Sequence, residues 1–232
     1  MALKDNLESE VETIFKEVWT ERDGTVVPES DDLKLGNDAV KLDATVLYAD
    51  ISGSTTLVDD YKPTFAAEIY KAFLHCAAKI IRAEDGVITA YDGDRVMGVY
   101  IGDSKNTSAA RSALKINHAR IHIIINETLK KQYPKTTFRL QHTVGVDTSR
   151  LFIARTGIRG SNDLVWVGRA ANYAAKLSAL SPSYASYVTA DVYNTMNKSQ
   201  KVSSDGRAMW TRLTWPEMDD MTIYGSTWWR RV

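Results

Sequence analysis

The sequence is poor in the residues that build disulfide frameworks or strongly charged surfaces. It has one cysteine, Cys76, among 232 residues, and 29 basic residues against 29 acidic ones. One cysteine excludes a network of disulfide bonds within the chain and suits the reducing cytoplasm. A formal net charge of zero argues against a protein that coats nucleic acid or binds anionic membranes. We therefore expect a cytoplasmic chain whose partners are neither nucleic-acid polymers nor membranes.

Long hydrophobic runs are also missing. The longest, at residues 121–125, falls far short of the ~20 apolar residues that cross a bilayer, and residues 1–5 contain no apolar signal core. With 44% hydrophobic residues, the chain can still bury one substantial core. We expect an N-terminal helix and connector over residues 1–40, and a catalytic domain over residues 41–232.

Histidine is scarce, with four residues in the chain. His118 and His122 are four positions apart, but Ala119 stands where a metalloprotease helix has glutamate. A Cys-x-x-Cys pair is impossible with one cysteine, so the pattern argues against zinc. We expect His75, His118, His122 and His142 to be surface or packing residues.

Apolar spacing predicts an α+β protein. An amphipathic helix for packing or dimerisation is expected over residues 5–20, followed by a polar connector. Further helices are expected at 55–60, at 63–86, at 106–132 with Asn106, Thr107 or Ser108 as its cap, and at 169–180. The helix from Pro63 should bury Ile69, Phe73, Cys76, Ala77 and Ile80. Strands are expected at 45–50, 87–91, 95–100, 137–146, 151–154 and 164–167. The order is βαββαβ, a ferredoxin-like arrangement in which an antiparallel or mixed sheet packs against helices.

Two acids lie where strand-like runs break into turns. The run at 45–49 ends at Asp50, and residues 52–55 follow as Ser-Gly-Ser-Thr, whose backbone N–H groups could cradle phosphates. Asp94 follows Asp92-Gly93, the dipeptide that best tolerates the positive φ angles of a type I′ turn. Each acid alone could be a turn residue. Together they predict a site for two hard cations, Mg²⁺ or Mn²⁺, which prefer oxygen ligands and bridge carboxylates to phosphates.

Three segments resemble the motifs of class III nucleotidyl cyclases. Residues 48–55, Tyr-Ala-Asp-Ile-Ser-Gly-Ser-Thr, are similar to the first metal motif of that family, and residues 92–97, Asp-Gly-Asp-Arg-Val-Met, to the second. Residues 168–177, Gly-Arg-Ala-Ala-Asn-Tyr-Ala-Ala-Lys-Leu, are similar to its Gly-x-x-Val-Asn-x-Ala-x-Arg-Leu helix. The three motifs occur in the family's order within residues 41–190.

The resemblance implies the roles of five residues. Asp50, Asp94 and the carbonyl group of Ile51 would bind two divalent cations. Asn172 would orient the ribose, and Lys176 would offset charge at the α-phosphate. The resemblance also implies a homodimer, because in this family the metal half and the Asn/Arg half of each site come from different protomers.

Several positions depart from the purine cyclases of the class. Ala90 and Val165 stand where those enzymes use side chains that read the base, which argues against ATP or GTP. Tyr48 could narrow the pocket toward a smaller base. Arg95 could donate to a pyrimidine or to a phosphate, or could be a solvent-facing charge of the hairpin.

The phosphate contacts also differ from the usual pattern. Lys176 stands where the family usually has arginine. The positive charge is kept, but the planar guanidinium group, which can form two parallel hydrogen bonds to a phosphate, is lost. Tyr224 stands in place of the lysine that grips the γ-phosphate, which leaves Arg169 as a candidate for that contact by position only.

This combination resembles the bacterial pyrimidine nucleotide cyclases of Pycsar antiphage systems. Those enzymes make cyclic UMP or cyclic CMP, which activates an effector and kills the infected cell. Two carbonyl groups make uracil the better acceptor for a guanidinium, which favours UTP over CTP. The alternatives are a cytidylate cyclase, an adenylate cyclase with atypical base contacts, and an inactive cyclase-fold domain that binds nucleotide.

Overall fold

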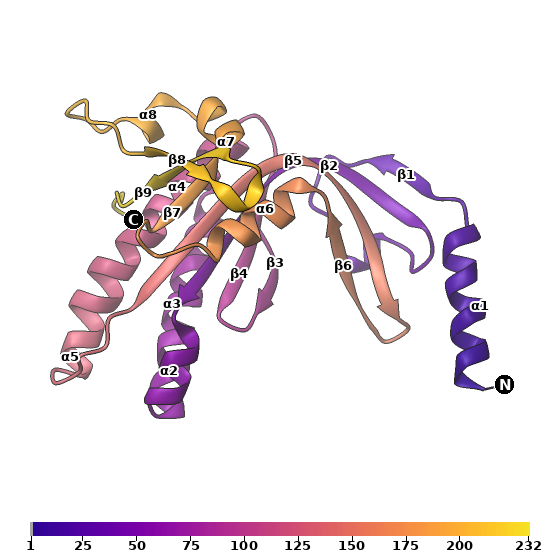
Figure 1. The fold of residues 1–232 in the computed structure, drawn as a ribbon, viewed down its shortest axis with the longest axis horizontal. Coiled ribbons are helices and arrows are strands. Elements are labelled where there is room, and N and C mark those ends of the chain that lie inside the picture. Colours follow the sequence, from indigo (N-terminus) through magenta and orange to yellow (C-terminus); the bar gives the residue numbers. More distant parts are fainter. Residues whose placement is uncertain (1) are drawn as a thin grey trace. The chain divides into compact units, whose positions relative to one another are not determined.

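The computed structural model describes residues 2–232, apart from the side chain of Asn126, and Figure 1 shows its elements. The chain divides into two compact units. One holds the residues up to Asp43 together with Arg150–Gly168, and the other holds Ala44–Ser149 and Arg169–Val232. Two long strands, β2 (Asp38–Ser52) and β5 (Gln141–Ile158), contribute residues to both units.

A mixed sheet forms the base of the larger unit. Its strands run in the order β3-β4-β2-β5-β7-β9-β8. The additional strands are β3 (Val87–Asp92), β4 (Arg95–Tyr100), β7 (Ser186–Thr189), β8 (Thr211–Trp215) and β9 (Met221–Ser226). β2 pairs antiparallel with β4, and β5 pairs parallel with β7. The predicted hairpin and the predicted mixed sheet are therefore present.

Helices cover one face of this sheet. They are α2 (Ser54–Asp60), α3 (Pro63–Ala83), α4 (Lys105–His118), the π-helix η2 (Ala119–Leu129) and α5 (Lys130–Gln132). Leu47, Ala49 and Ile51 of β2 belong to the same buried cluster as Phe73 of α3. Because side chains alternate along a strand, Tyr48, Asp50 and Ser52 lie on the opposite face.

Helix α6 (Arg169–Ser178) packs on that opposite face. A Cβ added at Gly145 of β5 would lie 2.2 Å from the carbonyl oxygen of Ala174, so a side chain at this position would push the helix away. Val144 and Val146, on either side of Gly145, belong to the buried cluster beneath α3 and α4. The acidic motif of β2 and the helix of the third motif therefore share one face of the sheet.

The C-terminal part of the larger unit contains elements that the sequence analysis did not predict. They are β7, β8, the short helices α7 (Ala190–Thr195) and α8 (Lys198–Lys201), and the 3₁₀ turn η3 (Pro216–Met218). Trp210 and Trp215 are buried there, whereas Trp229 is 44% exposed.

The long helix predicted over 106–132 differs from the prediction in two ways. Residues 119–129 are π-helical, and the N-cap is Ser104. The expected caps are used for tertiary contacts instead. Asn106 accepts a hydrogen bond from Thr45 and donates one to Thr195, and Thr107 accepts one from the backbone of Asn197. Local capping preference is therefore overridden by packing against β2 and α7.

Three smaller predictions are also corrected. The strands expected at 137–146 and 151–154 are one strand, β5, which begins at Gln141. Cys76 is half-buried rather than buried. In the hairpin, Asp92 pairs with Arg95, so Gly93 and Asp94 form the turn. Only Gly93 has positive φ (60°), which is the type II′ pattern rather than type I′.

The smaller unit is built around the outer parts of β2 and β5. β1 (Thr20–Asp23) pairs parallel with β2, and β6 (Ser161–Val167) pairs antiparallel with β5. The predicted connector therefore contains a strand, and the 3₁₀ turn η1 (Ser30–Asp32) follows it. Arg155 donates to Asn162 and to the carbonyl oxygen of Leu33, which ties β5 to β6 and to the segment after η1.

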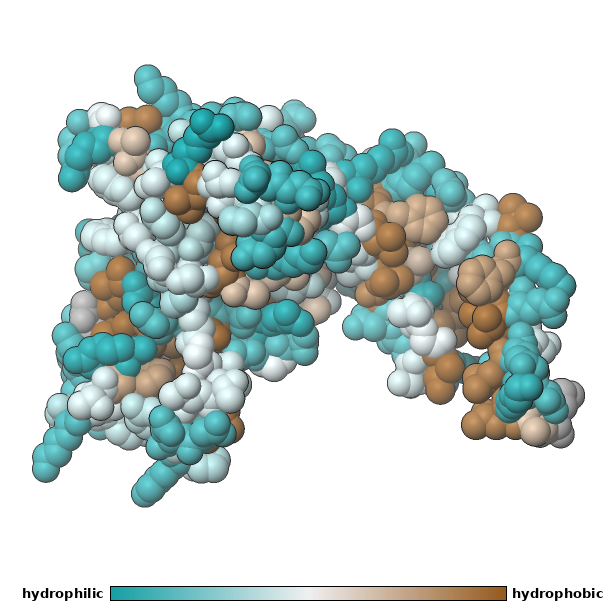
Figure 2. Space-filling model, viewed as in Figure 1, coloured by the Kyte–Doolittle hydropathy of each residue, from teal (hydrophilic) through white to brown (hydrophobic). Residues whose placement is uncertain are grey.

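Helix α1 (Leu3–Lys16) ends earlier than the predicted residue 20 and has no buried residue. Its apolar side chains are exposed, as the hydrophobic colour on this helix in Figure 2 shows; they are Leu3, Leu7, Val11, Ile14 and Phe15. Within residues 2–232, no helix has the length and apolar content needed to cross a membrane.

Candidate active site

Strand pairing gathers the acidic motifs at one end of the hairpin. Asp50 of β2 lies opposite Arg95 of β4, and Arg95 lies opposite Asp92 of β3. Asp94 occupies the turn next to them. The first two predicted motifs, more than 40 positions apart in sequence, are thus brought together by backbone register alone.

The acids of this group repel one another. Burial, with the charge of Asp94 as the next cause, raises the pKa of Asp50 to about 6, although Arg95 and the backbone N–H of Ile51 act in the opposite direction. A carboxyl group beside a second carboxylate is stabilised in its charged form by a cation. Asp50 and Asp94 therefore lie where a divalent cation would relieve the repulsion.

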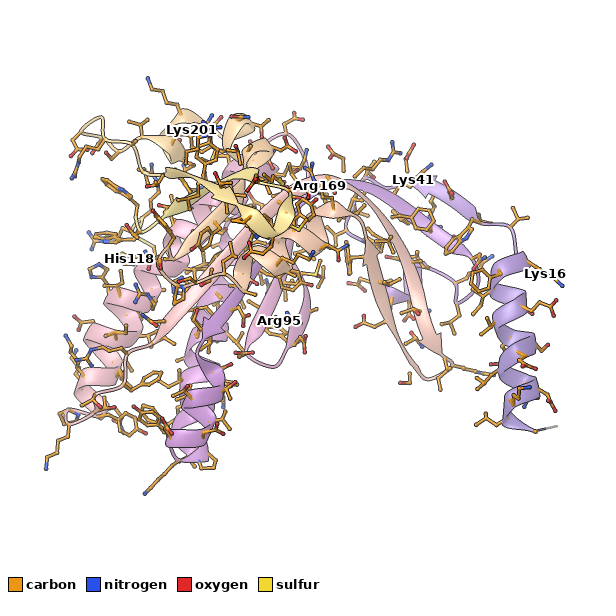
Figure 3. All side chains as sticks on the ribbon, viewed as in Figure 1. Lys16, Lys41, Arg95, His118, Arg169 and Lys201 are labelled. Carbon is orange, nitrogen blue, oxygen red and sulfur yellow. The ribbon has the colours of Figure 1, made fainter. Side chains whose placement is uncertain are left out.

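Arg95 is shared between the acids and an aromatic ring. Its Nε atom lies 3.1 Å from Oδ2 of Asp92, and a second, shorter hydrogen bond joins its Nη2 atom to the same oxygen. Its guanidinium carbon lies 5.7 Å from the centre of the Tyr48 ring. Burial raises the pKa of the Tyr48 hydroxyl, so the phenol is a neutral hydrogen-bonding group beside a fixed cation. Figure 3 shows Arg95 at this hairpin.

The segment after β2 turns sharply into α2. Gly53 has φ of 75° and forms the N-cap, a conformation in which any other side chain would be strained. The first intrahelical hydrogen bond joins the N–H of Leu57 to the carbonyl oxygen of Gly53, so the N–H groups of Ser54 and Thr55 precede the ladder. The hydroxyl of Ser52 lies 3.2 Å from that of Thr143 in β5 and anchors the start of this turn.

Asn172 and Lys176 lie one turn apart on α6, and both are exposed. Nζ of Lys176 is 3.5 Å from Sδ of Met218. Among residues 2–232, no hydrogen bond or ion pair joins either residue to Asp50 or Asp94. A single chain therefore presents two separate groups of predicted site residues on the same face of its sheet.

Arg169, at the start of α6, is engaged within the protein. Its Nε atom donates to Asp147 at 3.1 Å, and its Nη2 atom donates to the carbonyl oxygen of Thr148 at 2.8 Å and to Asp191. Figure 3 shows its position. A contact between Arg169 and a γ-phosphate would have to compete with two carboxylates, so these contacts favour a role in holding α6.

Asp147 is the residue at the centre of this network that sequence reasoning missed. Its side chain is fully buried and accepts a hydrogen bond of 2.6 Å from Thr189. Burial raises the pKa of Asp147 against the opposing effects of Thr189 and Arg169. The available signal was a single acid after the apolar run Val144–Val146, where a charge requires a partner.

The two positions associated with base selection lie in different units. Ala90 of β3 is half-buried, and the register between β3 and β4 shifts just before it. Val165 of β6 pairs with Ala154 and is 39% exposed. Neither position carries a side chain that could hydrogen-bond a purine.

The donor atoms at the acidic end fit hard divalent cations. No group of three or more His, Cys, Asp and Glu side chains that could hold a metal occurs in residues 2–232. Two carboxylates and one backbone carbonyl group are nevertheless the kind of set that Mg²⁺ uses when substrate phosphates and water complete its coordination. The repulsion between Asp50 and Asp94 also favours a bound divalent cation at this position.

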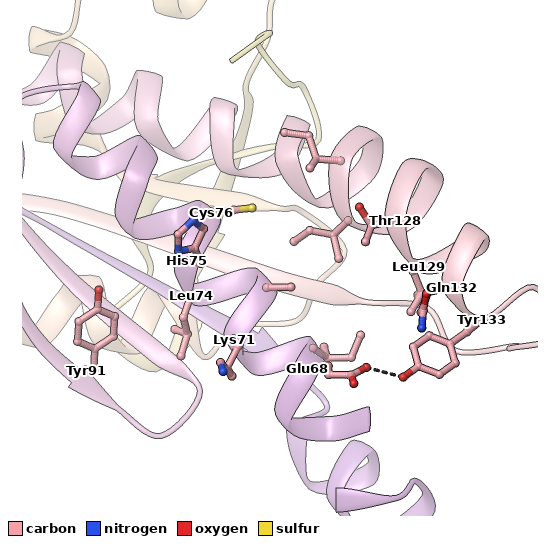
Figure 4. A pocket seen from close by; sticks show the side chains of 14 residues that line it. Glu68, Lys71, Leu74, His75, Cys76, Tyr91, Thr128, Leu129, Gln132 and Tyr133 are labelled. Carbon is pink, nitrogen blue, oxygen red and sulfur yellow. Dashed lines mark hydrogen bonds between the residues drawn. The ribbon is translucent and has the colours of Figure 1, made fainter. Parts of the chain in front are cut away.

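A large cavity of the described part of the chain lies elsewhere. A groove of about 780 Å³ opens between α3 and η2 (Figure 4). It is lined mainly by apolar side chains, with Cys76 in its wall and a hydrogen bond from Tyr133 to Glu68 at one end. None of the predicted site residues lines this groove. A search for the active site by cavity size alone would therefore not select the three sequence motifs.

Comparisons with known proteins decide the family. No protein-family model matches the chain. A uridylate cyclase of Xanthomonas perforans is 51% identical over 232 residues, with 99% of each chain covered. A uridylate cyclase of Burkholderia cepacia is 52% identical over 230 residues, with 98% of each chain covered. The chain belongs to the family of these uridylate cyclases. It is thus an enzyme, a cyclase of the lyase class.

Solved structures confirm the predicted fold of this cyclase. A bacterial light-regulated adenylyl cyclase has a TM-score of 0.66 at 19% identity, over 85% of this chain and 54% of the other. The guanylyl cyclase Cya2 also has a TM-score of 0.66, at 13% identity, over 82% of this chain and 94% of the other. The likeness covers most of the cyclase and includes the catalytic domains of class III cyclases.

Proposed function

We propose that the chain converts UTP to 3′,5′-cyclic UMP and pyrophosphate with two divalent cations, Mn²⁺ or Mg²⁺. The observation that carries the proposal is the group formed by Tyr48, Asp50, Asp94 and Arg95, in which two mutually repelling acids lie beside one cation and one phenol. The names of the two full-length relatives support the same substrate.

The acids hold the reacting part of the substrate. Asp50, Asp94 and the carbonyl group of Ile51 would bind the two cations, which would supply charge stabilisation at the triphosphate and at the 3′-oxygen when bound. The N–H groups of Ser54 and Thr55, at the start of α2, would contact the phosphate oxygens. Ser52 and Gly53 shape this turn through the contact with Thr143 and the left-handed backbone.

The reaction exchanges one phosphorus–oxygen bond for another. The ribose 3′-hydroxyl would give its proton to solvent water, and the 3′-oxygen would form a bond to the α-phosphorus. The bond from that phosphorus to the bridging oxygen of the β-phosphate would break, and pyrophosphate would leave. Asn172 would orient the ribose, and Lys176 would offset the negative charge that builds at the α-phosphate. Arg169 would hold α6, which carries both residues, through Asp147 and Asp191.

The base would lie against Tyr48 and Arg95. The ion pair with Asp92 fixes the guanidinium, so it would present its remaining N–H groups to a carbonyl oxygen of uracil. Ala90 and Val165 would leave the purine contacts unmade, since neither side chain can hydrogen-bond. A site of this kind would favour a small base with two acceptor groups.

Two chains would be needed for each site. Asn172 and Lys176 of one chain have no described contact with Asp50 or Asp94 of the same chain. A homodimer in which α6 of one protomer faces the acids of the other would join them. The exposed apolar side chains of α1 are available for contact in such a dimer.

The product would act as a messenger. By resemblance to the pyrimidine cyclases of antiphage systems, cyclic UMP would bind an effector in the bacterial cytoplasm and stop growth of the infected cell. Co-expression with an effector that responds to cyclic UMP, followed by challenge with phage, tests this role, with Asp50→Ala as the inactive control. Equal phage growth with wild-type and Asp50→Ala chains would contradict it.

Product analysis tests the reaction itself. The purified chain is incubated with Mn²⁺ and each of UTP, CTP, ATP and GTP, and products are separated by chromatography. We expect cyclic UMP as the main product, and a loss of preference for UTP of roughly 10- to 100-fold in Arg95→Ala. Cyclic CMP as the main product would move the assignment to a cytidylate cyclase, and purine products alone would overturn the base argument.

A further inference from the structure

A second cavity of the larger unit has the chemistry of an anion site. It has a volume of about 450 Å³ and opens between α4, the segment 203–209 and the C-terminal segment. The C-terminal segment is fixed there, because Asn117 donates to the carbonyl oxygens of Thr227 and Trp228, and the N–H of Arg230 donates to that of Leu114. Four cations line the cavity: Arg111, Lys115, Arg230 and Arg231.

The positive charge of this cavity is only partly balanced. Glu84 is 5% exposed and pairs with both Arg111 and Lys115, the latter at 2.7 Å. Among residues 2–232, Glu84 is the only acid in ion-pair contact with any of the four cations. Four cations therefore face one acid. The Nη2 atom of Arg230 donates to the carbonyl oxygen of Ser199, while its buried Nε atom has no hydrogen-bond partner.

Aromatic rings stand beside these cations. Trp228 and Trp229 both line the cavity. Trp229 is 44% exposed and contacts the ring of His122 with its centre 4.6 Å away, so one side of the indole is supported and the ring remains accessible. Guanidinium groups bind phosphates through two N–H groups at once, and an indole supplies a surface on which a base can stack. The combination matches a nucleotide rather than a bare anion.

We propose that this cavity binds a nucleoside phosphate, with its phosphates on Arg230 and Arg231 and its base on Trp229. Its volume is in the range of small-ligand pockets. No residue that lines it comes from β2, from the β3–β4 hairpin or from α6. The site is therefore separate from the residues proposed for cyclisation, and it gives this cyclase a place where substrate, product or another nucleotide can bind without being turned over.

Calorimetric titration of the full chain with UTP in EDTA tests the site. Without divalent cations, the repelling acids Asp50 and Asp94 disfavour a triphosphate at the candidate active site, which isolates the second cavity. We expect UTP to bind, and its dissociation constant to rise about tenfold in Arg231→Ala and in Trp229→Ala. Trp229→Phe should retain most of the affinity. The matched control Arg139→Ala, an exposed arginine outside the cavity, should leave it unchanged.

Photo-crosslinking locates the bound base. 5-Iodo-UTP in EDTA should label the peptide that contains residues 228–231, and thermal melting confirms that each variant is folded. Absence of UTP binding in EDTA, equal affinity in wild type and both alanine variants, or labelling confined to β2–β4 and α6 would overturn the proposal. So would pyrophosphate binding as tightly as UTP, which indicates an anion site only, or much tighter binding of a uridine decanucleotide, which indicates a polymer.

Discussion

The two groups of candidate site residues are built in different ways. The acidic group depends on strand register, which places Asp50 opposite Arg95. Burial, and next the charge of Asp94, raises the pKa of Asp50 to about 6. The helical group depends on α6, whose first residue, Arg169, is held by two carboxylates, while Asn172 and Lys176 are exposed. The acidic group is thus fixed by the sheet, whereas the two side chains of the helical group project into solvent.

This difference predicts how a mutation in each group of residues affects stability and activity. Loss of an acid removes a ligand but should spare the fold, because it relieves repulsion. Loss of a contact beneath α6 should cost both stability and activity, because that helix is positioned by a buried charge. The comparison is tested most directly by mutating each group of residues in a separate chain and then forming dimers that contain one chain of each variant.

The largest effect is expected when the two halves are damaged on separate chains. We expect Asp50→Asn and Asn172→Ala each to lower turnover on the order of 10³-fold. When the two variants are co-expressed with different tags, about half of the dimers contain one chain of each kind. One of the two composite sites in such a dimer is intact, so activity should return to about a quarter of wild type.

The readout is cyclic nucleotide formed per mole of total chain. Thermal melting of each variant alone checks that neither has unfolded, and Asp50→Asn should melt no lower than wild type. Activity that stays at the level of the single variants would place both halves of the site within one chain. Such a result would remove the composite dimer while leaving the roles of the acids in place.

A smaller effect is expected when α6 is loosened at its start. Arg169→Ala leaves Asp147 fully buried with Thr189 as its remaining side-chain donor. We expect a loss of about 3 kcal/mol in the free energy of unfolding, at the low end of values for broken buried pairs because Arg169 is 39% exposed. The catalytic constant kcat should fall roughly 10- to 100-fold through misplacement of the helix.

Measuring kcat and KM separately shows whether Arg169 positions α6 or binds the phosphates of the substrate. If Arg169 holds α6, Arg169→Lys should recover part of kcat with little change in KM, and Arg139→Ala should behave as wild type. A large rise in KM for UTP with kcat unchanged would instead assign Arg169 to the triphosphate, as its position in the sequence motif first suggested.

The acidic half could be predicted from sequence more fully than the network beneath α6. Asp50 ends an apolar run, and the hairpin that carries Asp94 has a local turn signal, so both were found from neighbouring residues. The continuity of β5 through residues 147–150 was not predicted, because Asp-Thr-Ser-Arg reads locally as a turn. It is extended because Thr189 and Arg169, from distant elements, satisfy Asp147.

Partners distant in sequence also explain the other differences. Asn106 and Thr107 were expected to cap a helix, and instead bond Thr45, Thr195 and Asn197. Such contacts are decided by tertiary packing, which a single sequence does not display. The acids were singled out because a charge at the end of a buried strand is costly in any fold, and their role as metal ligands stays a prediction.

The smallest expected effect concerns β5, the strand that supports both halves. It carries Thr143, which contacts Ser52, and Asp147, which holds Arg169. His142, the residue before Thr143, is 2% exposed and packs against the ring of Phe73. Burial lowers the pKa of His142 from its ordinary 6.5 to about 3, so the folded chain keeps this imidazole neutral. The unfolded chain binds a proton there as the pH falls below about 6.5.

Acidification should therefore weaken the fold through His142. The free energy of unfolding should be unaffected by His142 above pH 6.5, and should fall by up to about 1.4 kcal/mol per pH unit as the pH drops from 6.5 toward 3. His142→Phe should remove this part of the pH dependence, measured by urea unfolding at pH 7 and pH 5. The control Phe73→Leu changes the packing beside His142 without removing a titrating group, so it should lower stability equally at both pH values. If His142→Phe kept the pH dependence of wild type, the acid sensitivity would come from other groups, and β5 would not be the strand through which low pH loosens both halves together.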